Sequence, residues 1–172
     1  GKTVDNVHTL RVLLYDGTEL TVGPTTEAEL DAIAREGSRR AEIYAALRSI
    51  RDRFAHQIRG RFPQIPRRVS GYNLDQLLPE NGFNVARALV GTEGTCAIVL
   101  EATLRLIESP RHRTLVGLGY ADAFAAADHV PAILDTGPIG LEGIKGGIVD
   151  GLQHKGAPNL DLLPQGRGNL LV

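Results

Sequence analysis

Residues 89–107 read LVGTEGTCAIVLEATLRLI, a short glycine-containing loop that leads directly into an apolar stretch. Glycine has no Cβ, so the loop around Gly91 and Gly94 would let backbone amides approach a ligand closely. The apolar residues that follow predict a β-strand over 96–107. A G-x-x-G turn before a strand is more often structural than functional, and this one lacks the lysine and spacing of a P-loop. The pattern alone leaves its role open.

The N-terminal part of the chain predicts a β-hairpin that can belong to the same sheet. Residues 7–15 and 18–22 are rich in strand-forming side chains, and Asp16-Gly17 lies between them. Asp-Gly between two such runs is a strong signal for a tight turn. We therefore expect an antiparallel or mixed sheet built from the hairpin and from residues 96–107.

Two helices are expected between the hairpin and the glycine loop. Thr26 and Glu29 match a capping box for a short helix that Gly37 would end. Residues 38–59 predict a longer helix, because apolar residues recur at spacings of three and four. Its apolar face consists of Ile43, Leu47, Ile50, Phe54 and Ile58. We expect the first four to be buried as the helix covers one face of the sheet, and Phe54→Ala to cost about 3 to 5 kcal/mol.

Beyond this helix, Pro63, Pro66 and Gly71 predict a loop over 62–72, with short helical turns near 74–78 and 84–89. The organisation changes near residues 108–112. Further along, strands alternate with helices in a βαβ-type order that predicts a second small α+β unit. The expected strands are 114–120, 139–144 and 169–172, and the expected helices are 121–134 and 147–154.

The composition excludes several classes of protein. The chain has 172 residues, 42% of them hydrophobic and 23% charged, which excludes intrinsic disorder and collagen-like repeats. Apolar runs are too short to span a membrane and no signal segment opens the chain, so we expect a cytoplasmic protein. Cys96 is the single cysteine, which excludes an internal disulfide and a cysteine-held cluster. We expect it to be a small buried filler. The five histidines lack metal-ligand spacing, so neither a metal site nor a catalytic residue is assigned.

Both ends of the sequence suggest a processed or excised piece. The chain begins with Gly1-Lys2, contains no methionine, and ends in the strand-like run 168–172. We therefore expect a fragment of a longer protein.

The basic residues are concentrated in one region. The chain carries 16 arginines and 3 lysines at a net charge of −1, and nine of the arginines lie within residues 39–68. One interpretation is a solvated helix face with local ion pairs. The alternative is a non-catalytic interaction module, in which the arginine-rich helix 38–61 binds an acidic partner or nucleic acid.

A longer set of motifs narrows these possibilities. The motifs are GKTVDNV at 1–7, RRVSGYNL at 67–74, LVGTEGT at 89–95 and EATLRL at 101–106, with the hairpin between the first two. In order and spacing this set resembles the FAD-linked oxidases and dehydrogenases of the D-lactate dehydrogenase and glycolate oxidase type. That family shares the flavin-binding fold of vanillyl-alcohol oxidase. The resemblance covers almost the whole chain and is greatest to long members with an iron-sulfur domain downstream.

The resemblance implies an α+β fold in two parts. Residues 1–109 would form the second FAD-binding subdomain, a sheet with covering helices, and 110–172 the beginning of a ferredoxin-like α+β cap that binds substrate. The cofactor would be lined by Gly91, Glu93, Gly94 and Thr95, with the backbone of Ile98 meeting the adenine. Cys96-Ala97 replaces the Leu-Gly that usually follows in the family.

The implied function is oxidation of a 2-hydroxy acid such as D-lactate or glycolate by hydride transfer to the flavin. Only half of the FAD site is expected in this chain, because the family's pyrophosphate cradle has no counterpart in it. Almost none of the substrate site is expected, because the family's substrate-binding residues have no counterpart either. The chain by itself is therefore predicted to be inactive. An iron-sulfur cluster is possible in the full-length protein but not here. The expected partner is a small-molecule substrate, without nucleic acid or a membrane span, and the fragment could self-associate. The role of residues 70–73 stays open.

Overall fold

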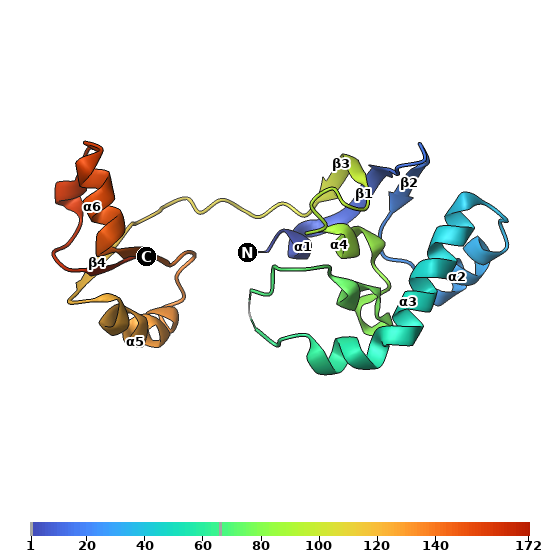
Figure 1. Cartoon of the computed structure of the whole chain (residues 1–172), viewed down its shortest axis with the longest axis horizontal. Coiled ribbons are helices and arrows are strands. Elements are labelled where there is room, and N and C mark those ends of the chain that lie inside the picture. The colour runs from blue at the N-terminus through green and yellow to red at the C-terminus, as the bar shows by residue number, and fades with distance from the viewer. Residues whose placement is uncertain (1, 66) are drawn as a thin grey trace. The chain divides into compact units, whose positions relative to one another are not determined.

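The computed structural model describes residues 2–65 and 67–172. Gly1, the first residue of the 1–7 motif, and Pro66, one of the expected helix breakers, lie outside the described residues. The chain separates into two compact units, Gly1–Glu108 and Ser109–Val172 (Figure 1). Each unit combines helices with a three-stranded antiparallel sheet, which confirms the α+β class. Their assignment as a flavin subdomain and a cap stays a prediction.

The first sheet contains the predicted hairpin and the predicted strand after the glycine loop. Its strands are β1 (Val7–Leu13), β2 (Glu19–Val22) and β3 (Ile98–Leu104), arranged in the order β2-β1-β3. Gly17 occupies the turn with a φ of 82°, a conformation that glycine adopts without steric cost. Strand β1 pairs antiparallel with both neighbours, so a segment about 90 residues away completes the sheet. Arg11 ties all three strands together through Glu19 at 2.7 Å and Glu101 at 2.5 Å.

The two helices predicted after the hairpin begin close to their expected positions. Helix α2 (Glu27–Ala34) starts with the Thr26–Glu29 capping box, and α3 (Arg39–Arg61) starts after Ser38, whose hydroxyl accepts a hydrogen bond from the Ala41 amide at 3.2 Å. The structure also contains a short helix that was not predicted, α1 (Thr3–Asn6). The remaining elements are the 3₁₀ turns η1 (Leu74–Leu77) and η2 (Pro79–Asn81) and the helix α4 (Val85–Leu89).

The predicted buried face of α3 was wrong. Ile43, Leu47 and Ile50 are only half-buried, and Phe54 is 37% exposed. The buried residues of the helix are Ala41, Tyr44, Arg51 and Ile58. The reason is that α3 packs against α2 and η1, whereas α4 contacts β1. The helix therefore does not cover the sheet directly, and the large cost expected for Phe54→Ala does not apply.

The core of the first unit is centred on a residue outside the long helix. Phe83 is 1% exposed and lies between Tyr44, at a ring-centroid distance of 6.3 Å, and the Arg51 guanidinium, 5.3 Å above its ring. Arg51 is buried because its charge is paired with Glu27 at 2.5 Å and Asp52 at 2.7 Å. The rest of the core comes from β1, β2, α2, α3, η1 and α4: Val7, Leu10, Val12, Val22, Leu30, Ile33, Ala41, Leu77, Val85 and Ala86.

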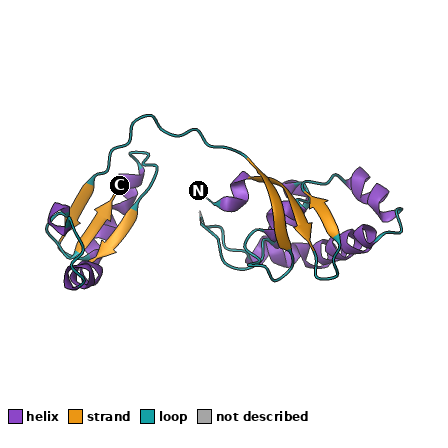
Figure 2. Ribbon diagram, turned by 90° about the horizontal axis from the view of Figure 1, so that it is seen from above, coloured by secondary structure: helices purple, strands orange, loops and turns teal. Residues whose placement is uncertain are grey.

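The second unit has the expected order of elements along the chain. The order of its strands within the sheet was not predicted. Its strands are β4 (Gly117–Tyr120), β5 (Glu142–Lys145) and β6 (Gly168–Leu171), and its helices are α5 (Ala123–Leu134), α6 (Gly146–His154) and the 3₁₀ turn η3 (Leu160–Leu162). Strand β6 lies between β4 and β5 and is antiparallel to both (Figure 2). Strands β4 and β5 are therefore parallel to each other, which makes β4-α5-β5 a split βαβ unit.

Strand β3 forms an edge of the first sheet, and all seven of its residues are exposed. The apolar side chains among them include Ile98 and Val99. An apolar edge strand offers unpaired backbone groups to another chain. Self-association of the chain stays a prediction. Among the described residues, no helix is long and apolar enough to cross a membrane.

The end of α3 is joined to η2 by an ion pair that should make stability depend on pH. Arg59 donates to both carboxylate oxygens of Glu80, at 2.7 and 2.8 Å, and these bonds lower the pKa of Glu80 to about 2. A carboxylate with a depressed pKa stabilises the fold above its unfolded pKa and loses that contribution as the pH falls through the folded pKa.

We therefore expect part of the stability of the first unit to be lost between about pH 4.5 and pH 2. Glu80→Gln should reduce the loss of stability over this pH range. The measurement is the urea midpoint of unfolding at each pH. Arg59→Gln should reduce the loss in the same way, because it removes the partner that lowers the pKa. An unchanged loss in both variants would contradict the assignment.

Candidate functional site

The glycine loop, residues 91–95, connects α4 to β3 and has an unusual backbone. Gly91, Glu93 and Gly94 have φ values of 86°, 52° and 75°, so three of its five residues are left-handed. For Glu93 this conformation costs about 1 to 2 kcal/mol, because its Cβ approaches the backbone. Non-glycine residues held in this region cluster at functional sites. Phe83 of the first unit also has a positive φ, 42°, but it is buried in the core, whereas Glu93 is exposed to a ligand.

Backbone amides of the loop are available to a ligand. The Thr92 amide donates to the Leu89 carbonyl at 3.2 Å, and the Thr95 amide donates to the Thr92 carbonyl at 3.0 Å. Within the described part of the chain, the amides of Glu93, Gly94 and Cys96 make no hydrogen bond, and all three residues are exposed. Exposed amides of this kind can donate to acceptor atoms of a bound molecule.

The two threonine hydroxyls hold the loop in shape. Thr92 is buried and its hydroxyl donates to the Leu89 carbonyl at 2.8 Å, while the Thr95 hydroxyl donates to the Thr92 carbonyl at 2.6 Å. Thr95 was predicted to line a cofactor, and the structure gives its hydroxyl a role inside the loop. Thr92 was not predicted, although a hydroxyl residue between two glycines is the signal that could have identified it.

Two residues just after the loop are exposed, and one of them departs from its prediction. Cys96 was expected to be buried and is exposed, as are all seven residues of β3, the strand that it was expected to begin. Its sulfur lies 3.8 Å from the Thr95 hydroxyl oxygen. Ile98 opens β3, pairs with Leu13 and is 61% exposed.

The segment 71–73, whose role the sequence left open, approaches the glycine loop at two points and the preceding residue, Val90, at a third. The Tyr72 hydroxyl lies 2.8 Å from the Thr95 hydroxyl oxygen. The Asn73 side chain is buried and donates to the Val90 carbonyl at 2.7 Å. A Cβ built on Gly91 would lie 3.7 Å from the Gly71 carbonyl oxygen. The structure thus adds Tyr72 and Asn73 to the candidate site.

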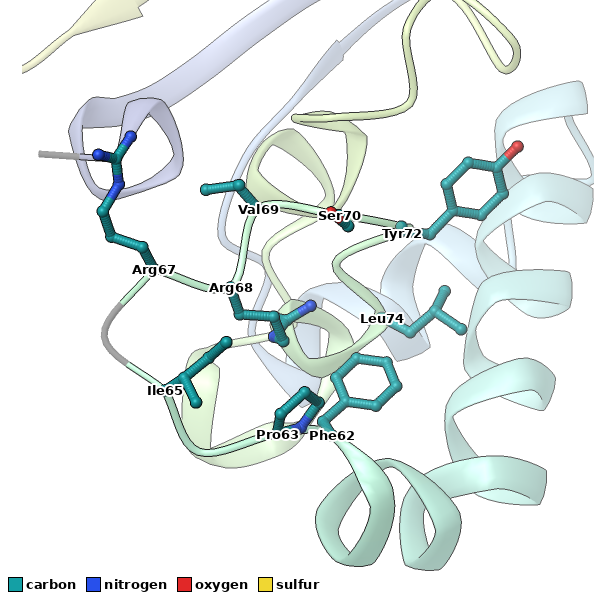
Figure 3. Close-up of a pocket in the computed structure, with 10 residues that line it drawn as sticks. Phe62, Pro63, Ile65, Arg67, Arg68, Val69, Ser70, Tyr72 and Leu74 are labelled. Atoms are coloured by element: carbon teal, nitrogen blue, oxygen red, sulfur yellow. The ribbon is translucent and has the colours of Figure 1, made fainter. Parts of the chain in front are cut away.

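A pocket of about 600 Å³ lies beside this segment and is formed by the loop between α3 and η1 (Figure 3). Its walls are mostly apolar, with Phe62 and Leu74 on one side. Arg68 is turned inward, paired with Asp75 at 2.5 Å, and its guanidinium lies 4.7 Å above the Phe62 ring. Arg67 is exposed and points away from Phe62 and Leu74 in Figure 3. Tyr72 also lines this pocket, hereafter the 62–74 pocket.

The arginines of α3 are largely neutralised by carboxylates. Their partners come from the turn after β1, from α2 and the turn that follows it, from α3 itself and from η2. The pairs are Arg39 with Asp16 and Glu42, Arg40 with Glu36, Arg48 with Glu27 and Asp31, Arg51 with Glu27 and Asp52, and Arg59 with Glu80. This supports the interpretation of a solvated face with local pairs. It weighs against an interaction module that recognises nucleic acid, because phosphate binding needs free positive charge.

No group of three or more His, Cys, Asp or Glu residues suited to a metal ion occurs in residues 2–65 and 67–172.

Comparison with known proteins finds relatives of this sequence. No family model matches the sequence. Curated D-2-hydroxyglutarate dehydrogenases of Pseudomonas putida and Pantoea ananatis are 32% and 30% identical over 143 and 145 residues, in each case 83% of this chain. The chain is homologous to a segment of these dehydrogenases.

The homology confirms the predicted resemblance to the FAD-linked oxidase and dehydrogenase family. The D-2-hydroxyglutarate dehydrogenase of Escherichia coli matches in the same way, at 26% identity over 144 residues and 83% of this chain. The chain spans 14% of the length of each of these relatives. These relatives are named for a 2-hydroxy acid, D-2-hydroxyglutarate, and not for D-lactate or glycolate.

Proposed function

We propose that this chain is part of an FAD-dependent dehydrogenase that oxidises D-2-hydroxyglutarate. The observation that carries the proposal is the match of 83% of the chain to relatives named for that reaction. Since D-lactate and glycolate are 2-hydroxy acids too, they rank as alternative substrates behind the one in the relatives' names. Residues 1–109 would contribute to the flavin site and residues 110–172 to the substrate-binding cap.

The residues of the glycine loop fit a group approached by backbone amides. A Cβ built on Gly94 would have no atom within 4 Å, so the loop leaves open space beside it. The free amides of Glu93, Gly94 and Cys96 can donate to carbonyl, ring-nitrogen or ribose acceptors. The edge position of β3 leaves backbone groups unpaired beside Ile98. We therefore assign Gly91, Glu93, Gly94, Thr95 and the backbone of Ile98 to the FAD site.

The loop is less suited to the pyrophosphate of the cofactor. It contains the carboxylate of Glu93 and no lysine or arginine, and two negatively charged groups repel each other at close range. This chain would thus hold uncharged parts of the FAD. When bound, FAD would supply the hydride acceptor for the oxidation.

The 62–74 pocket is our candidate for contact with the substrate. Its apolar walls suit the methylene groups of a five-carbon dicarboxylate, and its volume exceeds that of such a molecule. Arg68 is already paired with Asp75 and Arg67 points away from Phe62 and Leu74, so the Ser70 hydroxyl is a polar group available to orient a carboxylate. This chain would therefore help to bind and orient the acid.

A spectroscopic experiment tests the proposal in the FAD-loaded enzyme that contains this segment. Anaerobic addition of D-2-hydroxyglutarate should bleach the oxidised-flavin absorbance band, because oxidation of the acid reduces the flavin. L-2-hydroxyglutarate serves as the matched control and should leave the band in place. Bleaching by D-lactate or glycolate alone would keep the reaction class and change the substrate. The proposal fails if no 2-hydroxy acid bleaches the flavin.

A further inference from the structure

The Tyr72 side chain contacts both the 62–74 pocket and the glycine loop. The side chain lines the pocket, and its hydroxyl lies 2.8 Å from the Thr95 hydroxyl oxygen. Tyr72 is 48% exposed, so a molecule in the pocket can still cover it. None of the motifs that suggested a flavin enzyme required this contact.

The hydroxyl protons of Thr95 and Tyr72 decide which group donates in each hydrogen bond between the pocket and the loop. Thr95 has a single hydroxyl proton, and it is donated to the Thr92 carbonyl at 2.6 Å. The Tyr72 hydroxyl must therefore donate to Thr95. Tyr72, Thr95 and Thr92 thus form one chain of hydrogen bonds that runs from the pocket into the loop, and bonds in such chains strengthen one another.

A second set of contacts holds the loop independently of the Tyr72 hydroxyl. Asn73 binds the Val90 carbonyl, and the Thr92 hydroxyl binds the Leu89 carbonyl. Removing only the Tyr72 hydroxyl should therefore leave the fold and the position of the loop in place. The hydroxyl is needed only for the connection between the pocket and Thr95.

We infer that Tyr72 is a positioning residue that couples the 62–74 pocket to the glycine loop. A dicarboxylic acid that packs against Tyr72 restricts its side chain, which strengthens its hydrogen bond to Thr95 and orders the loop. Coupling of this kind is reciprocal, so a ligand on the loop also tightens binding in the pocket. The choice of a dicarboxylic acid as the ligand of this pocket rests on the proposed function.

Amide hydrogen exchange of this chain tests the coupling without a cofactor. The probe is glutarate, which has no 2-hydroxyl group to oxidise, and the reporters are the Thr92 and Thr95 amides, which are hydrogen-bonded inside the loop. Saturating glutarate should slow their exchange about 5-fold or more, the lower end of usual coupling strengths. In Tyr72→Phe the slowing should fall below about 2-fold while glutarate still binds.

Matched variants separate the hydroxyl contact from a general effect on structure. Tyr15→Phe removes the same hydroxyl group from a fully exposed tyrosine and should keep the full slowing. Thr95→Ser retains the hydroxyl and should preserve the effect, whereas Thr95→Val should abolish it.

The inference is overturned if glutarate leaves the two amides unchanged in the original chain, or if the slowing persists in Tyr72→Phe. Either result would leave the proposed function standing, because that function is tested by flavin bleaching. Conversely, glutarate could slow the exchange of the two amides in this chain while no 2-hydroxy acid reduces the flavin of the enzyme. That combination would support the coupling through Tyr72 and reject the proposed function.

Discussion

Replacing Phe83 by alanine should lower the free energy of unfolding of the first unit by about 3 to 5 kcal/mol. Phe83 is 1% exposed and fills the space between Tyr44 and the guanidinium of Arg51. Its loss would leave a cavity and would also remove the aromatic face over which the buried arginine lies. Urea unfolding followed by far-UV circular dichroism would measure the change.

Phe54→Ala is the matched control for this prediction. The same substitution is made there at a residue that is 37% exposed and outside the core cluster. Because little apolar surface is withdrawn from water at that position, we expect a loss of about 1 kcal/mol or less. Equal losses at the two positions, or a larger one at Phe54, would contradict the placement of the core.

The second large effect concerns cofactor binding. We expect this 172-residue chain to bind FAD with a Kd above about 1 μM, at least a thousandfold weaker than a nanomolar flavoprotein, or about 4 kcal/mol less binding free energy. The glycine loop is open to solvent and has Glu93 but no cation to neutralise the pyrophosphate. Since the chain spans 14% of its relatives' length, residues elsewhere in such proteins are available to supply that charge.

Titration of FAD into the purified chain, followed by flavin fluorescence, measures this affinity. Gly94→Val should weaken whatever binding remains, because a β-branched residue is strained at a φ of 75°. Gly137→Val introduces the same strain at a φ of 69° in the second unit and should leave FAD binding unchanged. Nanomolar binding by this chain would show that it carries a complete cofactor site and that our division of the site is wrong.

The sequence by itself determined the features that depend on neighbouring residues. Asp16-Gly17 predicted the hairpin, because the turn needs a residue that tolerates a positive φ. Thr26 and Glu29 predicted the start of α2, because a capping box satisfies amides within one turn. The glycine loop and the strand after it were also found where expected. These signals are local, so they can be recognised before any tertiary contact is known.

Only the tertiary structure decided which surfaces meet. Arg51 is buried and Phe54 is not, because Glu27 and Phe83 lie against that side of α3 and together stabilise the charge. Strand β6 enters between β4 and β5, which the order of elements along the chain cannot reveal. Tyr72 meets Thr95 across 23 residues. Such contacts depend on how separate elements pack against each other. Packing is set by the shape and charge of both elements, and the spacing of apolar residues along one element does not reveal them.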